Sequence, residues 1–180
     1  EDFIWSPDGK QVLYVTKKLS GVAYAISTNT DIYVYNIETK STSNLTEDNK
    51  GYDTQPAFSA NGTLGYLQMK RDGYESDKND IIALIDGQKI NLTENWDGTV
   101  NSFRWSNDGT KVYFNAAIGG TVQLFEVNVP TAKKKTIVVK QITEGQFDMG
   151  DVVGETATQI VTTRKDMNHA AEIYIVLKKD

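Results

Sequence analysis

The sequence predicts an all-β fold: a fragment of a β-propeller with about four blades of four antiparallel strands each. Three observations lead to this fold class. They are a repeat of roughly fifty residues, a glycine-containing turn at the same place in each repeat, and strand-length runs without helical periodicity. A β-sandwich is the alternative, but a sandwich gives no reason for the same motifs to recur.

Three anchor motifs define the repeat. The first is a hairpin motif, the second is a Thr-Glu pair after an aliphatic residue, and the third is an aromatic residue followed by Asp. Along the chain they read WSPDG, LTE and YD, then FSANG, LTE and WD, then WSNDG, ITE and FD. Their recurrence in one order indicates that the chain repeats a single structural unit.

Each repeat is predicted to contain four short strands. The first strand ends at the aromatic residue of the hairpin motif, and the Asp-Gly or Asn-Gly that follows supplies the positive φ angles of a tight turn. Alternating β-branched and aromatic residues predict the next two strands, and the short fourth strand ends at the Thr-Glu anchor. The second strands are Val12–Thr16, Leu64–Met69 and Lys111–Asn115, and the third strands are Ile32–Ile37, Ile81–Asp86 and Val122–Val129.

The predicted blades cover residues 3–52, 53–99, 100–147 and 148–180. The last unit lacks the turn glycine, and we expect it to be incomplete, without a fourth strand. Because each propeller blade buries one face against the next, we expect Trp5, Phe58 and Trp105 in the core between blades. The chain opens inside a strand with neither a start methionine nor a signal peptide, so we expect it to be a piece of a longer protein.

Composition and charge exclude several classes of function. The chain has 19 Lys and Arg against 24 Asp and Glu, and its net charge of −5 argues against nucleic acid as a partner. It has no cysteine and one histidine, His169, which excludes disulfides and thiol catalysis and makes a metal site unexpected. No phosphate-binding loop, G-x-S-x-G elbow or membrane-length apolar run occurs, so we expect no cofactor, no catalytic residue and no membrane span.

The acids of the anchor motifs are predicted to gather at one end of the blades, together with the loops between second and third strands. Two interpretations stay open. A carboxylate at the start of an inner strand can accept backbone N–H groups and fix the link between blades. Alternatively, the acids form a ring that attracts a cationic group such as a peptide amino terminus. These acids are Glu47, Asp48, Asp53, Glu94, Asp97, Glu144 and Asp148.

A charged loop interrupts the second blade within Met69–Ile81, which reads MKRDGYESDKNDI. Its candidate substrate-binding residues are Arg71, Tyr74, Glu75 and Asp77, because long loops carry function more often than strands do. The alternative is that Arg71 pairs with the neighbouring acids on a solvated surface.

The hairpin motifs, the DIYVYNI-like third strands and the LT endings resemble propeller repeats shared by two bacterial groups. One is the periplasmic Tol-system propeller, and the other is the amino-terminal domain of the prolyl oligopeptidase family of serine peptidases. The charged loop resembles the R-x-G-[YF]-E-[SA]-D segment of the acylaminoacyl-peptidase and dipeptidyl-peptidase branch. The double-glutamate motif of the best-known dipeptidyl peptidases is not present. The matching residues are Arg71, Gly73, Tyr74, Glu75, Ser76 and Asp77.

This resemblance implies a non-catalytic propeller that gates and orients short peptides over a C-terminal α/β-hydrolase domain. The hydrolase domain and the peptides would be its partners in a bacterial serine peptidase, periplasmic or secreted, and Glu75 would hold the substrate's amino terminus. The alternative is a Tol-like or sensor propeller that binds a partner protein. The open flanks of a partial propeller also predict that the fragment self-associates.

Overall fold

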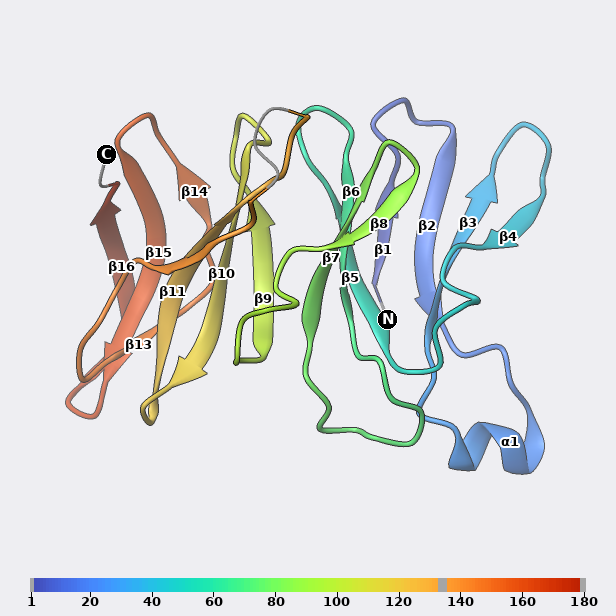
Figure 1. Ribbon diagram of the computed structural model, residues 1–180, viewed down its shortest axis with the longest axis horizontal. Helices are drawn as coiled ribbons and strands as arrows, with labels where there is room; N and C mark the ends of the chain where they lie inside the picture. Colours follow the sequence, from blue (N-terminus) through green and yellow to red (C-terminus); the bar gives the residue numbers. More distant parts are fainter. Residues whose placement is uncertain (1, 133–135, 179–180) are drawn as a thin grey trace. The chain divides into compact units, whose positions relative to one another are not determined.

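The computed structural model describes residues 2–132 and 136–178, which form four antiparallel sheets (Figure 1). The chain divides into two compact units, Glu1–Asn91 and Leu92–Asp180, with two sheets each. This architecture confirms the predicted all-β propeller class. The division of the chain into blades at residues 52, 99 and 147 stays a prediction.

The strands follow one another in each sheet much as the repeats predict. In the first unit the sheets are β1 (Phe3–Trp5), β2 (Gln11–Thr16), β3 (Asp31–Asn36) and β4 (Thr42–Asn44), then β5 (Asp53–Phe58), β6 (Leu64–Gln68), β7 (Asp80–Ile85) and β8 (Gln88–Asn91). In the second unit they are β9 (Val100–Trp105), β10 (Lys111–Ile118), β11 (Thr121–Asn128) and β12 (Val139–Gln141), then β13 (Asp148–Met149), β14 (Gly154–Glu155), β15 (Gln159–Asp166) and β16 (His169–Leu177).

The hairpin motif is a turn closed by its own side chains. The Ser6 hydroxyl donates to Asp8 Oδ1 at 2.6 Å and accepts the backbone N–H of Gln11 at 2.9 Å, while Gly9 has a φ of +70°. In the third repeat the Ser106 hydroxyl donates to Asp108 at 2.7 Å and accepts the N–H of Lys111 at 2.9 Å. The motif therefore recurs because it builds the same turn each time.

In the first and third repeats the threonine of the Thr-Glu anchor joins the end of the blade to its third strand. Thr46 is fully buried, and its hydroxyl accepts the N–H of Ile32 at 3.0 Å. Thr143 accepts the N–H of Leu124 at 2.9 Å in the same way. These hydroxyls satisfy buried backbone donors, which explains why the residue repeats.

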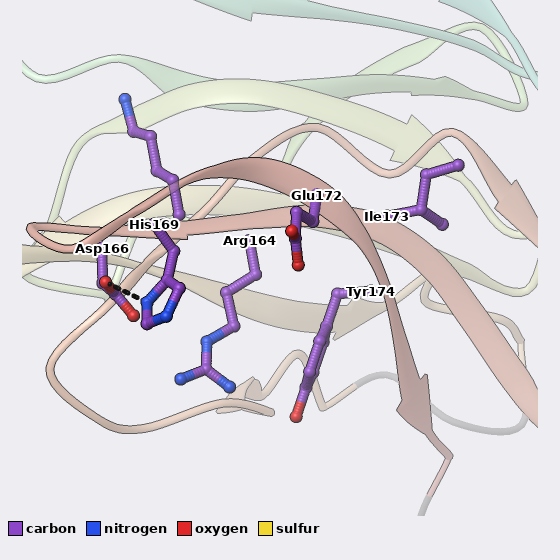
Figure 2. Close-up of a pocket in the computed structure, with 7 residues that line it drawn as sticks. Arg164, Asp166, His169, Glu172, Ile173 and Tyr174 are labelled. Atoms are coloured by element: carbon purple, nitrogen blue, oxygen red, sulfur yellow. Dashed lines mark hydrogen bonds and ion pairs between the residues drawn. The ribbon is translucent and has the colours of Figure 1, made fainter.

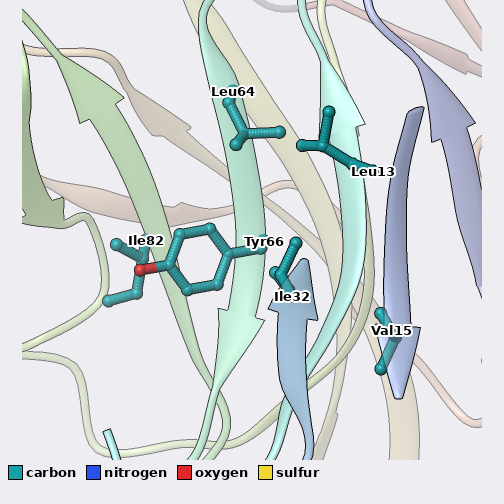
Figure 3. Packing of buried hydrophobic residues seen from close by; sticks show 6 residues of the cluster. All are labelled: Leu13, Val15, Ile32, Leu64, Tyr66 and Ile82. Carbon is teal, nitrogen blue, oxygen red and sulfur yellow. The ribbon is translucent and has the colours of Figure 1, made fainter. Parts of the chain in front are cut away.

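The core of the first unit lies between its two sheets. Leu13, Val15 and Ile32 from the first sheet pack against Leu64, Tyr66 and Ile82 from the second (Figure 3). Phe58 packs against this cluster, as predicted. The expectation for Trp5 is wrong, because its side chain is 58% exposed. Successive residues of a strand point to opposite faces, so Ile4 contacts the core and Trp5 points away from it.

The second unit has an apolar core between its sheets and a separate aromatic cluster on the other face of β10 and β11. Tyr113 and Leu124 pack with Met149, Ile160 and Val176 in the core. Trp105 is buried, with 6% exposure. The aromatic cluster joins Trp96, Phe114 and Phe125, whose ring centroids lie 5.1 to 5.4 Å apart.

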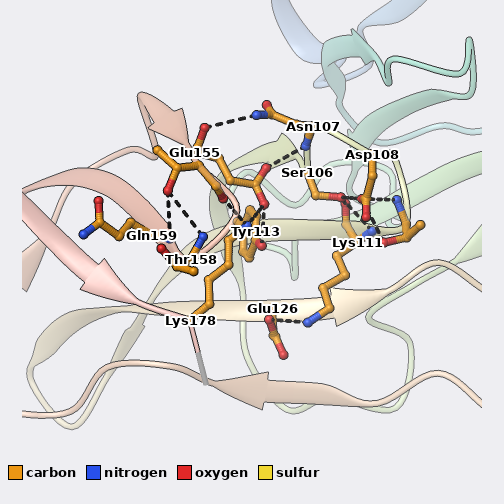
Figure 4. A network of polar contacts seen from close by, with 12 residues as sticks. Ser106, Asn107, Asp108, Lys111, Tyr113, Glu126, Glu155, Thr158, Gln159 and Lys178 are labelled. Atoms are coloured by element: carbon orange, nitrogen blue, oxygen red, sulfur yellow. Dashed lines mark hydrogen bonds and ion pairs between the residues drawn. The ribbon is translucent and has the colours of Figure 1, made fainter. Parts of the chain in front are cut away.

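A polar network links the two sheets of the second unit (Figure 4). Glu155 accepts the hydroxyl of Tyr113 at 2.9 Å and the backbone N–H of Asn107 at 2.6 Å, and it pairs with Lys178. A buried carboxylate with this many donors is well satisfied, so the network fixes how the two sheets pack.

The fourth sheet has four strand segments that occupy three strand positions. Both β13 and β14 pair with the same edge of β15: β13 pairs with residues 164–165 and β14 with residues 160–161. The other edge of β15 pairs with β16. The first position is therefore one strand interrupted at residues 150–153. Along β16 the side chains are largely exposed, with Ile173 at 79% and Leu177 at 65%. The predicted self-association depends on such surfaces and stays a prediction.

One short helix, α1 (Gly21–Ile26), lies in the loop between β2 and β3. The sequence did not predict it, because six residues are too few to show helical periodicity. Among the described residues, no helix is long and apolar enough to cross a membrane.

Candidate functional site

The two long loops of the first unit lie at the same end of its sheets. The loop that carries α1 and the loop between β6 and β7 both lie opposite the β1–β2 and β3–β4 turns (Figure 1). A hydrogen bond from the backbone N–H of Gly73 to the Thr28 hydroxyl, at 3.0 Å, joins them. All four predicted substrate-binding residues belong to the second of these loops.

Arg71 and Asp77 close that loop. The Arg71 guanidinium donates to Asp77 Oδ1 through Nε at 2.9 Å and lies 2.8 Å from it through Nη2. The backbone N–H of Arg71 donates to Asp77 Oδ2, also at 2.9 Å. The Arg71 guanidinium holds the pKa of Asp77 at about 2, well below its ordinary value. The pair is therefore charged at neutral pH and acts as a clasp across the base of the loop.

Tyr74 and Glu75 form the tip of the loop. The Arg71 guanidinium lies 4.1 Å from the centroid of the Tyr74 ring, a cation–π contact that orients both side chains. Tyr74 is nevertheless 52% exposed, and Glu75 is exposed as well. Among the residues that the structure describes, none pairs with the Glu75 carboxylate. The structure thus brings Arg71, Tyr74 and Asp77 into contact and leaves Glu75 unengaged beside them.

Three of the anchor acids, Asp48, Asp53 and Asp148, have structural partners. Asp148 accepts the backbone N–H of Val122 at 2.8 Å, and Asp48 pairs with Lys89. Asp53 is fully buried, while Asp97, at the same anchor of the next repeat, is exposed. The interpretation of Asp53 as part of an exposed ring is therefore wrong, because its backbone and side chain are enclosed by the sheet.

Asp53 holds the link between the two sheets of the first unit. Its carboxylate accepts hydrogen bonds from Gln68 Nε2 at 2.8 Å and Asn49 Nδ2 at 3.0 Å, and its backbone N–H donates to the carbonyl of Thr30 at 2.9 Å. Burial raises the pKa of Asp53 to about 7, although the hydrogen bonds from Gln68 and Asn49 act in the opposite direction. This carboxyl group is thus poised to titrate near neutral pH.

A pocket of about 240 Å³ lies on the β15–β16 hairpin (Figure 2). The Arg164 guanidinium lies 4.2 Å from the Phe147 ring centroid and 5.2 Å from that of Tyr174. His169 Nδ1 lies 2.8 Å from Asp166 Oδ1, and Asp166 also accepts the N–H of Asn168 at 2.8 Å. His169 is mostly exposed, as expected for a surface histidine, and its contact with Asp166 spans the turn between β15 and β16.

Sequence reasoning missed the contribution of the α1 loop. The Lys17 ammonium donates to the carbonyl oxygens of Tyr24, at 3.2 Å, and of Ser27, and so holds the end of α1. The one sequence feature that marks this loop is the segment 19–30, LSGVAYAISTNT, which has no charged residue. Among the described residues, no cluster of three or more metal-ligating side chains forms.

The sheets define the class of protein: successive four-stranded antiparallel sheets, with loops gathered at one end, are the blades of a β-propeller. Solved structures agree on this fold. The propeller domain of the trilobed protease of Pyrococcus furiosus matches 97% of this chain and 48% of its own, with a TM-score of 0.70 and 15% identity. Acylaminoacyl peptidase of Pyrococcus horikoshii gives 0.70 and 18%, over 97% and 25% of the two chains. A putative TolB of Agrobacterium tumefaciens gives 0.62 and 18%, over 98% and 60%.

Sequence similarity then points to particular relatives. The chain is 39% identical to dipeptidyl-peptidase 5 of Porphyromonas gingivalis over 154 residues, which are 84% of this chain and 22% of the relative. It is 40% identical to dipeptidyl-peptidase 5 of Porphyromonas endodontalis over 184 aligned residues, 99% of this chain and 26% of the relative. No protein-family model matches the chain. These homologues confirm the predicted resemblance to the prolyl oligopeptidase family. The chain spans about a quarter of their length.

Proposed function

We propose that the chain is the propeller part of a serine peptidase of the dipeptidyl-peptidase type, and that it orients short peptides over a separate hydrolase domain. The similarity to dipeptidyl-peptidase 5 supports this function over a Tol-like binding module. Identity with those relatives reaches 40%, whereas the putative TolB shares the fold at 18% identity. A periplasmic or secreted location of the parent protein is part of the same proposal.

The observation that carries the proposal is the exposed Glu75 carboxylate on a loop that is otherwise fixed. The Arg71–Asp77 clasp and the contact between Arg71 and Tyr74 hold the loop, so Glu75 can meet a ligand with little further ordering. A carboxylate is complementary to the ammonium group of a peptide's amino terminus. In this proposal Glu75 binds that ammonium, Tyr74 packs beside the first residue of the peptide, and Arg71 and Asp77 position both.

The test is the substitution Glu75→Gln in the full-length parent enzyme. A hydrogen bond between charged groups contributes about 1.5–3 kcal/mol, so kcat/KM for dipeptidyl substrates with a free amine should fall roughly 10- to 100-fold. The same substrates with an acetylated amine should be hydrolysed equally, if slowly, by both enzymes. The matched control is Asp72→Asn, which removes an exposed acid from the same loop. Equal loss in both variants, or no loss with free-amine substrates, would refute the proposal.

A further inference from the structure

The α1 helix presents apolar side chains to solvent. Its sequence, GVAYAI, is apolar on all sides, and a helix of that kind is normally buried. None of its residues is buried in the described structure. Val22 is 77% exposed and Ile26 is 74% exposed, and the preceding Leu19 is 42% exposed. Val22 and Ile26 are four residues apart and therefore share one side of the helix.

The loop around α1 also has no charge. Residues 19–30 contain no Asp, Glu, Lys or Arg, in a chain of which 24% is charged. The two lysines that precede this segment contact other residues of the first unit. Lys17 donates to the carbonyl oxygens of Tyr24 and Ser27, and the Lys18 ammonium lies 3.8 Å from the Tyr33 ring centroid. Depletion of charged residues is what distinguishes the core of a protein interface from the rest of a surface.

The α1 loop is held in place without help from a partner. Lys17 ties the helix end to the base of the loop, and Thr28 is bonded to Gly73 of the neighbouring loop. An isolated six-residue helix is unstable in water, so these contacts are what define its position. An apolar surface that is held in one conformation needs little ordering on contact with a partner.

We propose that Leu19, Val22 and Ile26, here called the α1 surface, dock against the hydrolase domain of the same polypeptide. The chain covers only 22–26% of the length of its peptidase relatives, so the rest of each relative is long enough to contain that domain. The proposed role of Glu75, on which this inference rests, places the hydrolase domain on the side of the propeller that carries the Glu75 loop. The loop of Glu75 is bonded to the α1 loop, so a hydrolase domain close enough to receive a peptide from Glu75 also meets the α1 surface.

Site-specific photo-crosslinking in the full-length parent tests this docking. Val22 is replaced by benzoylphenylalanine, and Ile37, an exposed apolar residue at the end of β3, is replaced in a control protein. Irradiation should join position 22, and not position 37, to a peptide of the hydrolase domain, identified by mass spectrometry. A crosslink to a second molecule, a crosslink confined to the propeller, or no crosslink would overturn the proposal.

Hydrogen exchange provides a second readout that needs no label at the surface. If the α1 surface is covered, the paired substitution Val22→Glu and Ile26→Glu should speed exchange of the amides of residues 22–27 at least about tenfold in the full-length protein. Ile37→Glu should leave these amides unchanged. Equal exchange in all three proteins contradicts the docking. The kinetics of Glu75→Gln are independent of both readouts, so failure of the substrate proposal and failure of the docking proposal can be told apart.

Discussion

The buried Asp53 makes the stability of the first unit depend on pH near neutrality. Burial raises its pKa from the ordinary 3.8 to about 7. Because the folded-state pKa is higher than the unfolded one, the folded state favours the neutral carboxyl group. Its contribution to stability is fully present below about pH 4 and is lost as the pH rises through about 7. Asp53→Asn keeps the shape of the side chain and removes the titration.

The size of the effect follows from the shift. A rise from 3.8 to about 7, at 1.36 kcal/mol per pKa unit, corresponds to roughly 4 kcal/mol over the whole range. Between about pH 4.5 and about pH 8 the wild-type protein should lose about 3 kcal/mol that the Asp53→Asn protein does not lose. The free energy of unfolding of the variant, relative to wild type, should therefore rise by that amount across the interval.

Urea unfolding followed by tryptophan fluorescence measures this difference at the two pH values. Other titrating groups cancel, because the comparison is between two proteins that share them. Asp97→Asn is the control, since Asp97 also follows an aromatic residue after the Thr-Glu anchor but lies before β9 and is exposed. A relative stability of Asp53→Asn that does not change with pH would refute the argument that burial governs this carboxyl group.

Three further predictions concern the anchors and the charged loop. Thr46→Val should lower the free energy of unfolding, measured in urea, by about 1–3 kcal/mol because it leaves the N–H of Ile32 without its acceptor. Thr42→Val, at an exposed position of β4, should leave it unchanged. Gly51→Ala should cost a similar amount, about 1–3 kcal/mol, because its Cβ would lie 2.1 Å from the carbonyl oxygen of Met69; an unchanged unfolding midpoint would contradict this packing. Arg71→Ala should raise the pKa of Asp77 from about 2 toward its ordinary value, as followed by NMR titration, and a pKa that stays near 2 would show that Arg71 is not the cause.

The repeated motifs made most of the fold predictable. The hairpin motif and the threonine anchor act through contacts within one blade, such as Ser6 with Gln11 and Thr46 with Ile32, so their spacing predicts strand order directly. The prediction that Trp5 lies in the core was wrong because the motif does not indicate which face of the strand is covered. Its neighbour Ile4 faces the core instead.

The candidate site was only partly predictable, because its contacts cross between loops. The charge pattern of 71–77 indicated the Arg71–Asp77 pair, but the bond from Gly73 to Thr28 joins residues 45 positions apart. The burial of Asp53 could not be predicted either. Asp97 also follows an aromatic residue, but it lies three residues before β9 and is exposed, whereas Asp53 begins β5. Such differences depend on what packs over each residue.

The most direct test of the proposed role of Glu75 is a crystal structure of the full-length parent with an uncleaved dipeptide analogue. We predict that the analogue's ammonium nitrogen lies about 3 Å from the Glu75 carboxylate, as in a charge-assisted hydrogen bond. We also predict that the Arg71–Asp77 clasp stays closed beside the bound analogue. An ammonium group bound by other residues, with Glu75 still facing solvent, would contradict this role of Glu75.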